Sequence, residues 1–143
     1  TDATIVTYGA QVRTALDAAV AAEDDGISLE VIDLRSLSPI DMNTVAASVR
    51  KTGRVVVTHE AAREAGVGAE LIASITEKCF HYLETPPRRV TGHDIPYPPS
   101  KLEKHHVPDL DRILHAVDLV LERGAGSSPT GGASAATVEG GVR

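Results

Sequence analysis

The stretch Arg54-Val55-Val56-Val57-Thr58 decides the fold of this 143-residue chain. Three consecutive β-branched residues favour a strand, and an apolar run without polar alternation is typical of a strand buried on both faces of a parallel sheet. Parallel strands need crossover connections, which are usually helices. The segments on either side of residues 54–58 should therefore alternate between helices and strands.

The N-terminal half of the chain follows this alternation. Residues 3–8 and 29–34 are β-branched or apolar runs that predict strands. Between them, residues 11–23 repeat apolar side chains at helical spacing, and we expect a buried face made of Val12, Ala15, Leu16, Ala19 and Val20. A second helix should begin at Ser38-Pro39, with Ser38 as its cap.

The C-terminal half continues the pattern. Residues 59–68 predict a loop, and a helix with Leu71, Ile72, Ile75 and Cys79 on one face should follow it. Residues 88–91 predict a weaker strand, residues 92–100 an extended loop with three prolines, and Pro108-Asp109 the start of a last helix. This order predicts an α/β fold: a three-layer domain with a mostly parallel sheet and helices on both faces.

The composition divides the chain into a domain and a tail. Residues 1–123 are sufficient for one α/β domain with a single core. Residues 124–143 hold six Gly, four Ala and three Ser and almost no large apolar side chain. Because burial cannot offset the entropy of ordering such a segment, we expect a Gly/Ala/Ser-rich disordered tail.

Charge and cysteine content exclude several classes of protein. The formal net charge of −6 argues against a nucleic-acid partner, and no apolar run is long enough to cross a membrane. The single cysteine, Cys79, excludes an internal disulfide. A single cysteine also favours a reducing compartment. Ten Arg against four Lys, with abundant Ala and Gly, are typical of a GC-rich bacterium, so we expect a cytoplasmic bacterial protein. Because the chain begins at Thr1 rather than Met, we expect it to be a piece of a longer protein.

Short motifs leave the chemistry open. His59-Glu60 follows a predicted strand, where it could be an acid–base pair or a hydrogen-bonded pair that fixes the turn, and we favour the second. Gly66-Val67-Gly68 lies at the start of a predicted helix, where phosphate can bind. The third glycine of the dinucleotide-binding fingerprint is missing, so we favour tight packing over phosphate binding. His105-His106, with Asp109, Asp111 and His115 nearby, could form a metal site, but adjacent histidines point apart and we favour a solvated surface. No complete catalytic site is predicted from these residues.

The proline-rich loop over residues 92–100 is a candidate protein contact. A loop stiffened by proline loses little entropy on docking, and Ile95 and Tyr97 offer apolar area beside the charge of Asp94. A plain connector between strand and helix is the alternative. Glu60, which follows His59, is a further candidate. The candidate interface residues are therefore Glu60, Asp94, Ile95, Pro96, Tyr97 and Pro98.

Taken in order, six stretches of the chain resemble the C-terminal domain of the transketolase-like β subunit of 2-oxo acid dehydrogenases. They are residues 29–35, 38–41, 51–54, 58–61, 66–70 and 89–98, and the resemblance extends over residues 3–122. Residues 59–61 and 77–86 look more like the branched-chain 2-oxo acid enzyme than the pyruvate enzyme.

The resemblance implies a full enzyme that holds thiamine diphosphate with Mg²⁺ between an α and a β subunit. That cofactor decarboxylates a 2-oxo acid, and the acyl unit passes to a lipoyl group. The family's diphosphate motif is absent here, because Asp24-Asp25-Gly26 lacks the first glycine and the Asn partner. The activating Glu belongs to a preceding domain. We therefore assign no catalytic, cofactor-binding or metal residue to this chain, and we expect the isolated domain to be inactive.

The role that the resemblance implies for this domain is assembly. It would pair with a second β subunit and with the α subunit, and it would help to receive the subunit-binding domain of the lipoyl acyltransferase. An acidic surface fits a basic partner. The alternatives are a pyruvate or acetoin dehydrogenase β subunit, or a free-standing α/β module that binds a ligand or regulates without catalysis.

Overall fold

The computed structural model describes residues 1–122, in which strands and helices alternate as expected. The elements are β1 (Ala3–Thr7), α1 (Gln11–Asp24), β2 (Leu29–Asp33), α2 (Met42–Thr52), β3 (Val55–Ala62), α3 (Val67–Cys79), η1 (Phe80–Tyr82), β4 (Arg88–Gly92), η2 (Glu103–His105) and α4 (Leu110–Val120). The predicted tail, residues 124–143, lies outside the described residues.

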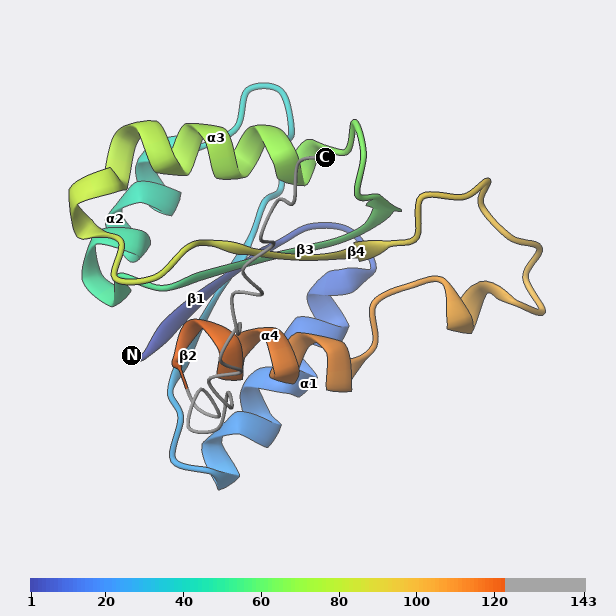
Figure 1. Ribbon diagram of the computed structural model, residues 1–143, viewed down its shortest axis with the longest axis horizontal. Helices are drawn as coiled ribbons and strands as arrows, with labels where there is room; N and C mark the ends of the chain where they lie inside the picture. The colour runs from blue at the N-terminus through green and yellow to red at the C-terminus, as the bar shows by residue number, and fades with distance from the viewer. Residues whose placement is uncertain (123–143) are drawn as a thin grey trace, which may run out of the picture.

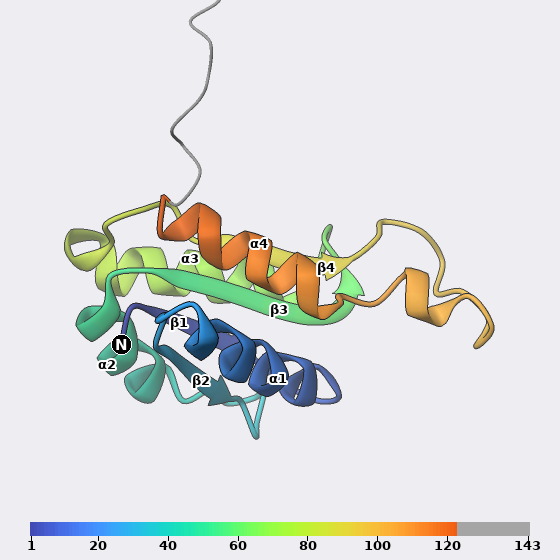
Figure 2. The same cartoon turned by 90° about the horizontal axis from the view of Figure 1, so that it is seen from below.

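The four strands form one parallel sheet in the order β2-β1-β3-β4. Helices α2 and α3 cover one face, and α1 and α4 cover the other (Figures 1 and 2). The predicted α/β fold with three layers is therefore confirmed. Among residues 1–122, no helix is long and apolar enough to cross a membrane.

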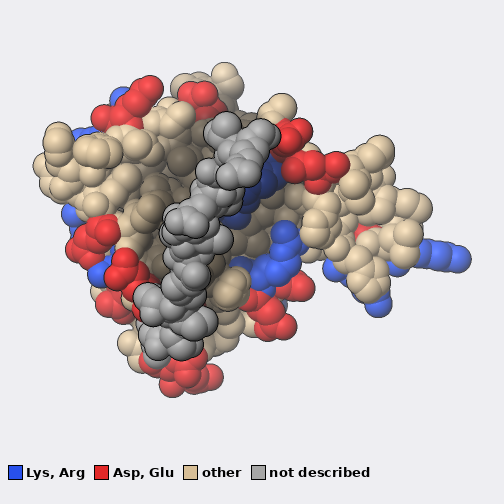
Figure 3. Space-filling view, viewed as in Figure 1, with Lys and Arg blue, Asp and Glu red and all other residues tan. Residues whose placement is uncertain are grey.

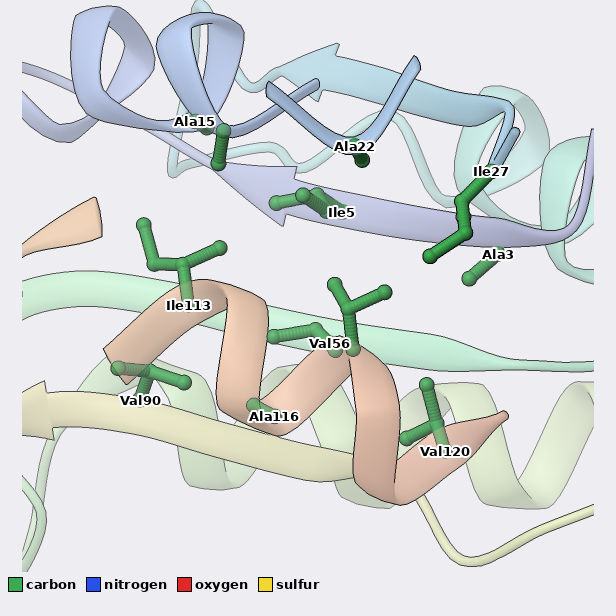
Figure 4. Close-up of a cluster of buried hydrophobic side chains, with 12 residues drawn as sticks. Ala3, Ile5, Ala15, Ala22, Ile27, Val56, Val90, Ile113, Ala116 and Val120 are labelled. Atoms are coloured by element: carbon green, nitrogen blue, oxygen red, sulfur yellow. The ribbon is translucent and has the colours of Figure 1, made fainter. Parts of the chain in front are cut away.

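The core lies in two layers, one on each face of the sheet. Val56 points into the layer under α1 and α4 (Figure 4), whereas Val55 and Val57 point into the layer under α2 and α3. All three valines are fully buried. The apolar run that decides the fold is uninterrupted because both faces of β3 are covered.

The buried face of α1 differs from the prediction. Alanines make the contact with the sheet, at Ala15, Ala18 and Ala22, while the side chains of Leu16 and Val20 are 48% and 67% exposed. Small side chains let the helix axis approach the sheet closely, so the helix turns its larger apolar residues outward. The helical spacing of apolar residues therefore predicts the burial of Ala15 correctly and that of Leu16 and Val20 wrongly.

The start of α2 also differs. Asp41, not Ser38, is the cap, because its Oδ1 accepts hydrogen bonds from the N–H groups of Asn43 and Thr44 at 3.2 and 3.1 Å. Gly53 ends this helix in the left-handed conformation, with φ of 67°. The last helix begins as predicted, with the carboxylate of Asp109 accepting from the N–H of Arg112.

Candidate subunit interface

A long connection between β4 and α4, residues 93–107, carries five of the six candidate interface residues. It leaves the sheet at the carboxyl end of β4 and extends beyond the rest of the domain (Figures 1 and 2). The short helix η2 lies within it. We call residues 93–107 the projecting loop.

Asp94 ties the base of the projecting loop to the loop before α3. Its Oδ1 accepts a hydrogen bond of 2.8 Å from the N–H of Glu64. The backbone of Gly92 lies so close to the carbonyl oxygen of Glu60 that a Cβ on Gly92 would overlap it. Glu60, near the end of β3, therefore adjoins the projecting loop, and the structure brings the sequence-predicted residues together.

Tyr97 holds the middle of the loop. Its hydroxyl donates a 2.5 Å hydrogen bond to Oε1 of Glu103 in η2, and its ring packs edge-on against His106 with the ring centroids 4.9 Å apart. The hydrogen bond to Glu103, which stabilises the neutral phenol, raises the pKa of Tyr97 to about 12. Tyr97 is thus an internal brace of the loop as well as an exposed aromatic side chain.

The outer surface of the loop exposes apolar side chains beside the charged Lys101 and Lys104. The side chains of Ile95, Tyr97 and Leu102 are 56%, 54% and 54% exposed. Ile95 and Leu102 border a shallow cavity of about 210 Å³, which Pro98 and three histidines also line. Pro96 is exposed and Pro98 is half-buried. Apolar side chains gathered on a braced loop are typical of protein contacts.

His106 contradicts the prediction of a solvated surface at His105-His106. His105 is exposed, but His106 is only 3% exposed and lies so close to Gly92 that a Cβ there would be 2.5 Å from its Nε2. The rings of His93 and Tyr97 pack edge-on against it. Only the fold places this histidine under the loop, and the sequence carries no periodic signal for it.

His59 also differs from its predicted place. β3 continues through it to Ala62, so His59 is fully buried within a strand rather than in a loop. Its Nε2 accepts a 3.1 Å hydrogen bond from the N–H of Gly68 at the start of α3. Burial lowers the pKa of His59 below its usual 6.5. The interpretation favoured from the sequence is a hydrogen-bonded pair of His59 and Glu60, whereas the partner of His59 at the strand–helix turn is the backbone N–H of Gly68.

The contact between His59 and Gly68 also leaves no room for a phosphate at the start of α3. A Cβ on Gly66 or Gly68 would overlap the His59 ring, and that ring already occupies the N–H of Gly68. Asp24 and Asp25 lie at the C-terminal end of α1, where the helix dipole disfavours anions. Among residues 1–122, no three His, Cys, Asp or Glu side chains are grouped to hold a metal ion. These residues do not fit thiamine diphosphate or its Mg²⁺.

A family model described as "Transketolase, C-terminal domain" matches residues 1–113. The chain belongs to this family. The resemblance inferred from the six sequence stretches is thereby confirmed. As a transketolase C-terminal domain, the chain carries the parallel sheet and the projecting loop on a scaffold shared with its relatives.

Curated relatives of this transketolase C-terminal domain are β subunits of 2-oxo acid dehydrogenases. The chain is 53% identical over 124 residues to the 3-methyl-2-oxobutanoate dehydrogenase subunit beta of Mycobacterium tuberculosis, covering 86% of this chain and 36% of the relative. It is 54% identical over 121 residues to the pyruvate dehydrogenase E1 component subunit beta of Leifsonia xyli, with 85% and 36% covered. The chain thus spans about a third of the length of these relatives, and the two substrate types match equally well.

Solved structures agree on the fold. A split gene transketolase, described as an inactive beta4 tetramer, matches with a TM-score of 0.68 and 31% identity, covering 85% of this chain and 38% of that one. A 2-oxoglutarate:ferredoxin oxidoreductase from Magnetococcus marinus matches with a TM-score of 0.56 and 12% identity, covering 85% of this chain and 18% of that one. The second likeness concerns the fold alone.

Proposed function

We propose that this chain is the assembly domain of the β subunit of a 2-oxo acid dehydrogenase, and that the projecting loop docks on a partner subunit. The observation that carries this proposal is the braced apolar loop at the carboxyl end of the sheet. Ile95, Tyr97 and Leu102 are each more than half exposed on it, while Asp94 and Glu103 hold its shape. A loop fixed in this way binds without a large ordering cost.

The matched relatives support the enzyme class. They are β subunits of dehydrogenases that act on 3-methyl-2-oxobutanoate or on pyruvate, and one structural relative is a tetramer of β chains. In the assembled enzyme, this domain would pair with a second β subunit and with an α subunit. Thiamine diphosphate and Mg²⁺ would be held by other parts of the complex and would supply the decarboxylation chemistry there.

The finer parts of the proposal are the substrate and the docking partner. We favour branched-chain 2-oxo acids over pyruvate because of residues 59–61 and 77–86, and we expect the acyltransferase's subunit-binding domain to contact this domain. The formal charge of −6 supports a basic partner for that contact. We also expect the protein to act in the cytoplasm and to contact neither membrane nor nucleic acid.

Reconstitution tests the proposal. The chain is mixed with the α subunit and with the remaining part of a β subunit, and assembly is followed by sedimentation. We expect a complex that decarboxylates 3-methyl-2-oxobutanoate in the presence of thiamine diphosphate and Mg²⁺, and no activity when this chain is left out. A chain that stays monomeric beside partners that assemble and turn over without it would contradict the proposal and favour a free-standing ligand-binding or regulatory module.

A further inference from the structure

Four arginines gather around a cavity of about 400 Å³ at the β4 edge of the sheet. Arg88 and Arg89 belong to β4, Arg63 precedes α3 and Arg112 lies on α4, so three separate segments contribute them. β4 is an edge strand, and its open side lies between α3 and α4. The space-filling view shows Lys and Arg atoms gathered in the hollow between these helices (Figure 3).

None of these four arginines forms an ion pair within residues 1–122. The ion pairs of this part join Arg13 to Asp17, Arg35 to Asp33, Lys51 to Glu30 and Arg54 to Glu84. In a chain with 20 acidic and 14 basic residues, four guanidinium groups without a carboxylate partner among residues 1–122 form an unbalanced local charge. Such a concentration of positive charge attracts anions.

Backbone carbonyls hold three of the four guanidinium groups in place. Nη1 of Arg89 donates to the carbonyl oxygen of Arg63 at 2.9 Å, and Nη1 of Arg63 donates to that of Arg89 at 3.5 Å. Nη2 of Arg112 donates to the carbonyl oxygen of Thr91 at 2.5 Å. Each guanidinium has five N–H donors, so these bonds orient the groups and leave donors over for a ligand.

The same bonds oppose the addition of a further strand at this edge. A peptide strand that paired with β4 would need its free carbonyl groups as acceptors. The carbonyls of Arg89 and Thr91, two residues apart and hence on the same side of the strand, already accept hydrogen bonds from guanidinium groups. Recognition at this edge therefore depends on the arginine side chains rather than on the backbone.

We propose that this arginine cavity binds a small organic phosphate that carries two or more negative charges. Guanidinium groups pair with phosphate oxygens in a bidentate manner, and several of them together suit a diphosphate better than a single carboxylate. Ile72, Val90 and Leu119 line the same cavity and provide contact for an apolar part of the ligand. A volume of about 400 Å³ is within the range of small-molecule sites.

The test uses the 143-residue chain with inorganic pyrophosphate and adenosine diphosphate as probes, without Mg²⁺, at low ionic strength. Calorimetry should show saturable binding of both, weaker in added salt, and adenosine diphosphate should bind more tightly because the flat faces of its adenine ring can pack against the apolar lining. The double variant Arg63→Gln/Arg88→Gln should lose about tenfold or more in affinity. The control Arg13→Gln/Arg50→Gln removes the same charge outside the cavity and should stay within about twofold of wild type.

Three results would overturn the proposal. The first is the absence of saturable binding of either phosphate. The second is an equal loss of affinity in the control variant, which would indicate a general charge effect. The third is binding of an oligoglutamate peptide while both phosphates fail to bind, which would assign the cavity to an acidic protein segment. Because the isolated chain is used, none of these results depends on assembly with other subunits.

Discussion

The imidazole Nε2 of His59 accepts a hydrogen bond from the N–H of Gly68 at 3.1 Å, so a side chain buried in β3 closes the N-terminal end of α3. The bond requires an unprotonated Nε2, which places the proton of the neutral ring on Nδ1. The ring of Tyr8 stacks on the imidazole of His59, with the ring centroids 5.8 Å apart. A titratable group thus couples the central strand to the helix that packs on it.

This coupling predicts a stability that depends on pH. Burial lowers the pKa of His59 in the folded chain, so the unfolded chain binds a proton more readily below the usual His pKa of 6.5. The contribution is therefore present above about pH 6.5 and is lost as the pH falls below that value. Urea denaturation at a series of pH values below about 6.5 should show a fall in the free energy of unfolding as the pH decreases.

Two variants separate His59 from other histidines. His59→Gln keeps a side-chain acceptor without a titratable ring, so its free energy of unfolding should fall less as the pH decreases below about 6.5. His81→Gln changes an exposed histidine and should keep the wild-type slope. Parallel curves for His59→Gln and wild type would show that His59 does not cause the pH dependence.

Gly68→Ala should destabilise the chain, although alanine favours helices more than glycine does. The added Cβ would overlap the His59 ring, and the expected cost is about 1–3 kcal/mol. In a His59→Ala background the same change should be neutral or stabilising. A double-mutant cycle by chemical denaturation measures this coupling, and additive effects would contradict the packing described for His59.

Glu103→Gln should lower the pKa of Tyr97. The raised value of about 12 depends first on the hydrogen bond from the phenol to the Glu103 carboxylate, and a neutral amide stabilises the phenol less. Ultraviolet titration of the tyrosines checks this, with Glu77→Gln on α3 as a control that removes a carboxylate elsewhere. An unchanged titration curve in Glu103→Gln would mean that the hydrogen bond between Tyr97 and Glu103 of η2 does not form.

Mg²⁺ should not produce micromolar binding of thiamine diphosphate by the isolated chain, and the chain should not decarboxylate 2-oxo acids. The physical reason is that residues 1–122 contain no group of side chains that could hold Mg²⁺. In addition, the ring of His59 already accepts the hydrogen bond of the Gly68 N–H at the start of α3. Calorimetry with and without Mg²⁺ measures this. A micromolar, Mg²⁺-dependent heat of binding would refute the claim.

Sequence alone predicts the parts of this fold that depend on local patterns. Val55, Val56 and Val57 predict a strand covered on both faces, and Asp109 predicts the start of α4, because each signal lies within a few residues. The outward turn of Leu16 is not predictable in this way, since it depends on how closely alanines let α1 approach the sheet.

The candidate sites show the same division. The prolines and Tyr97 mark the projecting loop from the sequence, but its brace to Glu103 and the burial of His106 arise only when the loop folds back on itself. The arginine cavity is still less visible, because Arg63, Arg89 and Arg112 come from separate segments that meet only at the β4 edge. Patterns within a few residues do not predict contacts between segments that are distant in the sequence.

A charge placed on the projecting loop tests whether this loop docks on a partner subunit. Ile95 is the suitable position, because its side chain is 56% exposed, whereas Tyr97→Ala would also remove the brace to Glu103. Val20→Asp on α1, where the side chain is 67% exposed, is the matched control. Circular dichroism verifies that both variants fold, and sedimentation measures association with the α and β partner subunits. We expect Ile95→Asp to weaken association by about tenfold or more and Val20→Asp to change it little. Wild-type association of a folded Ile95→Asp chain would contradict this docking.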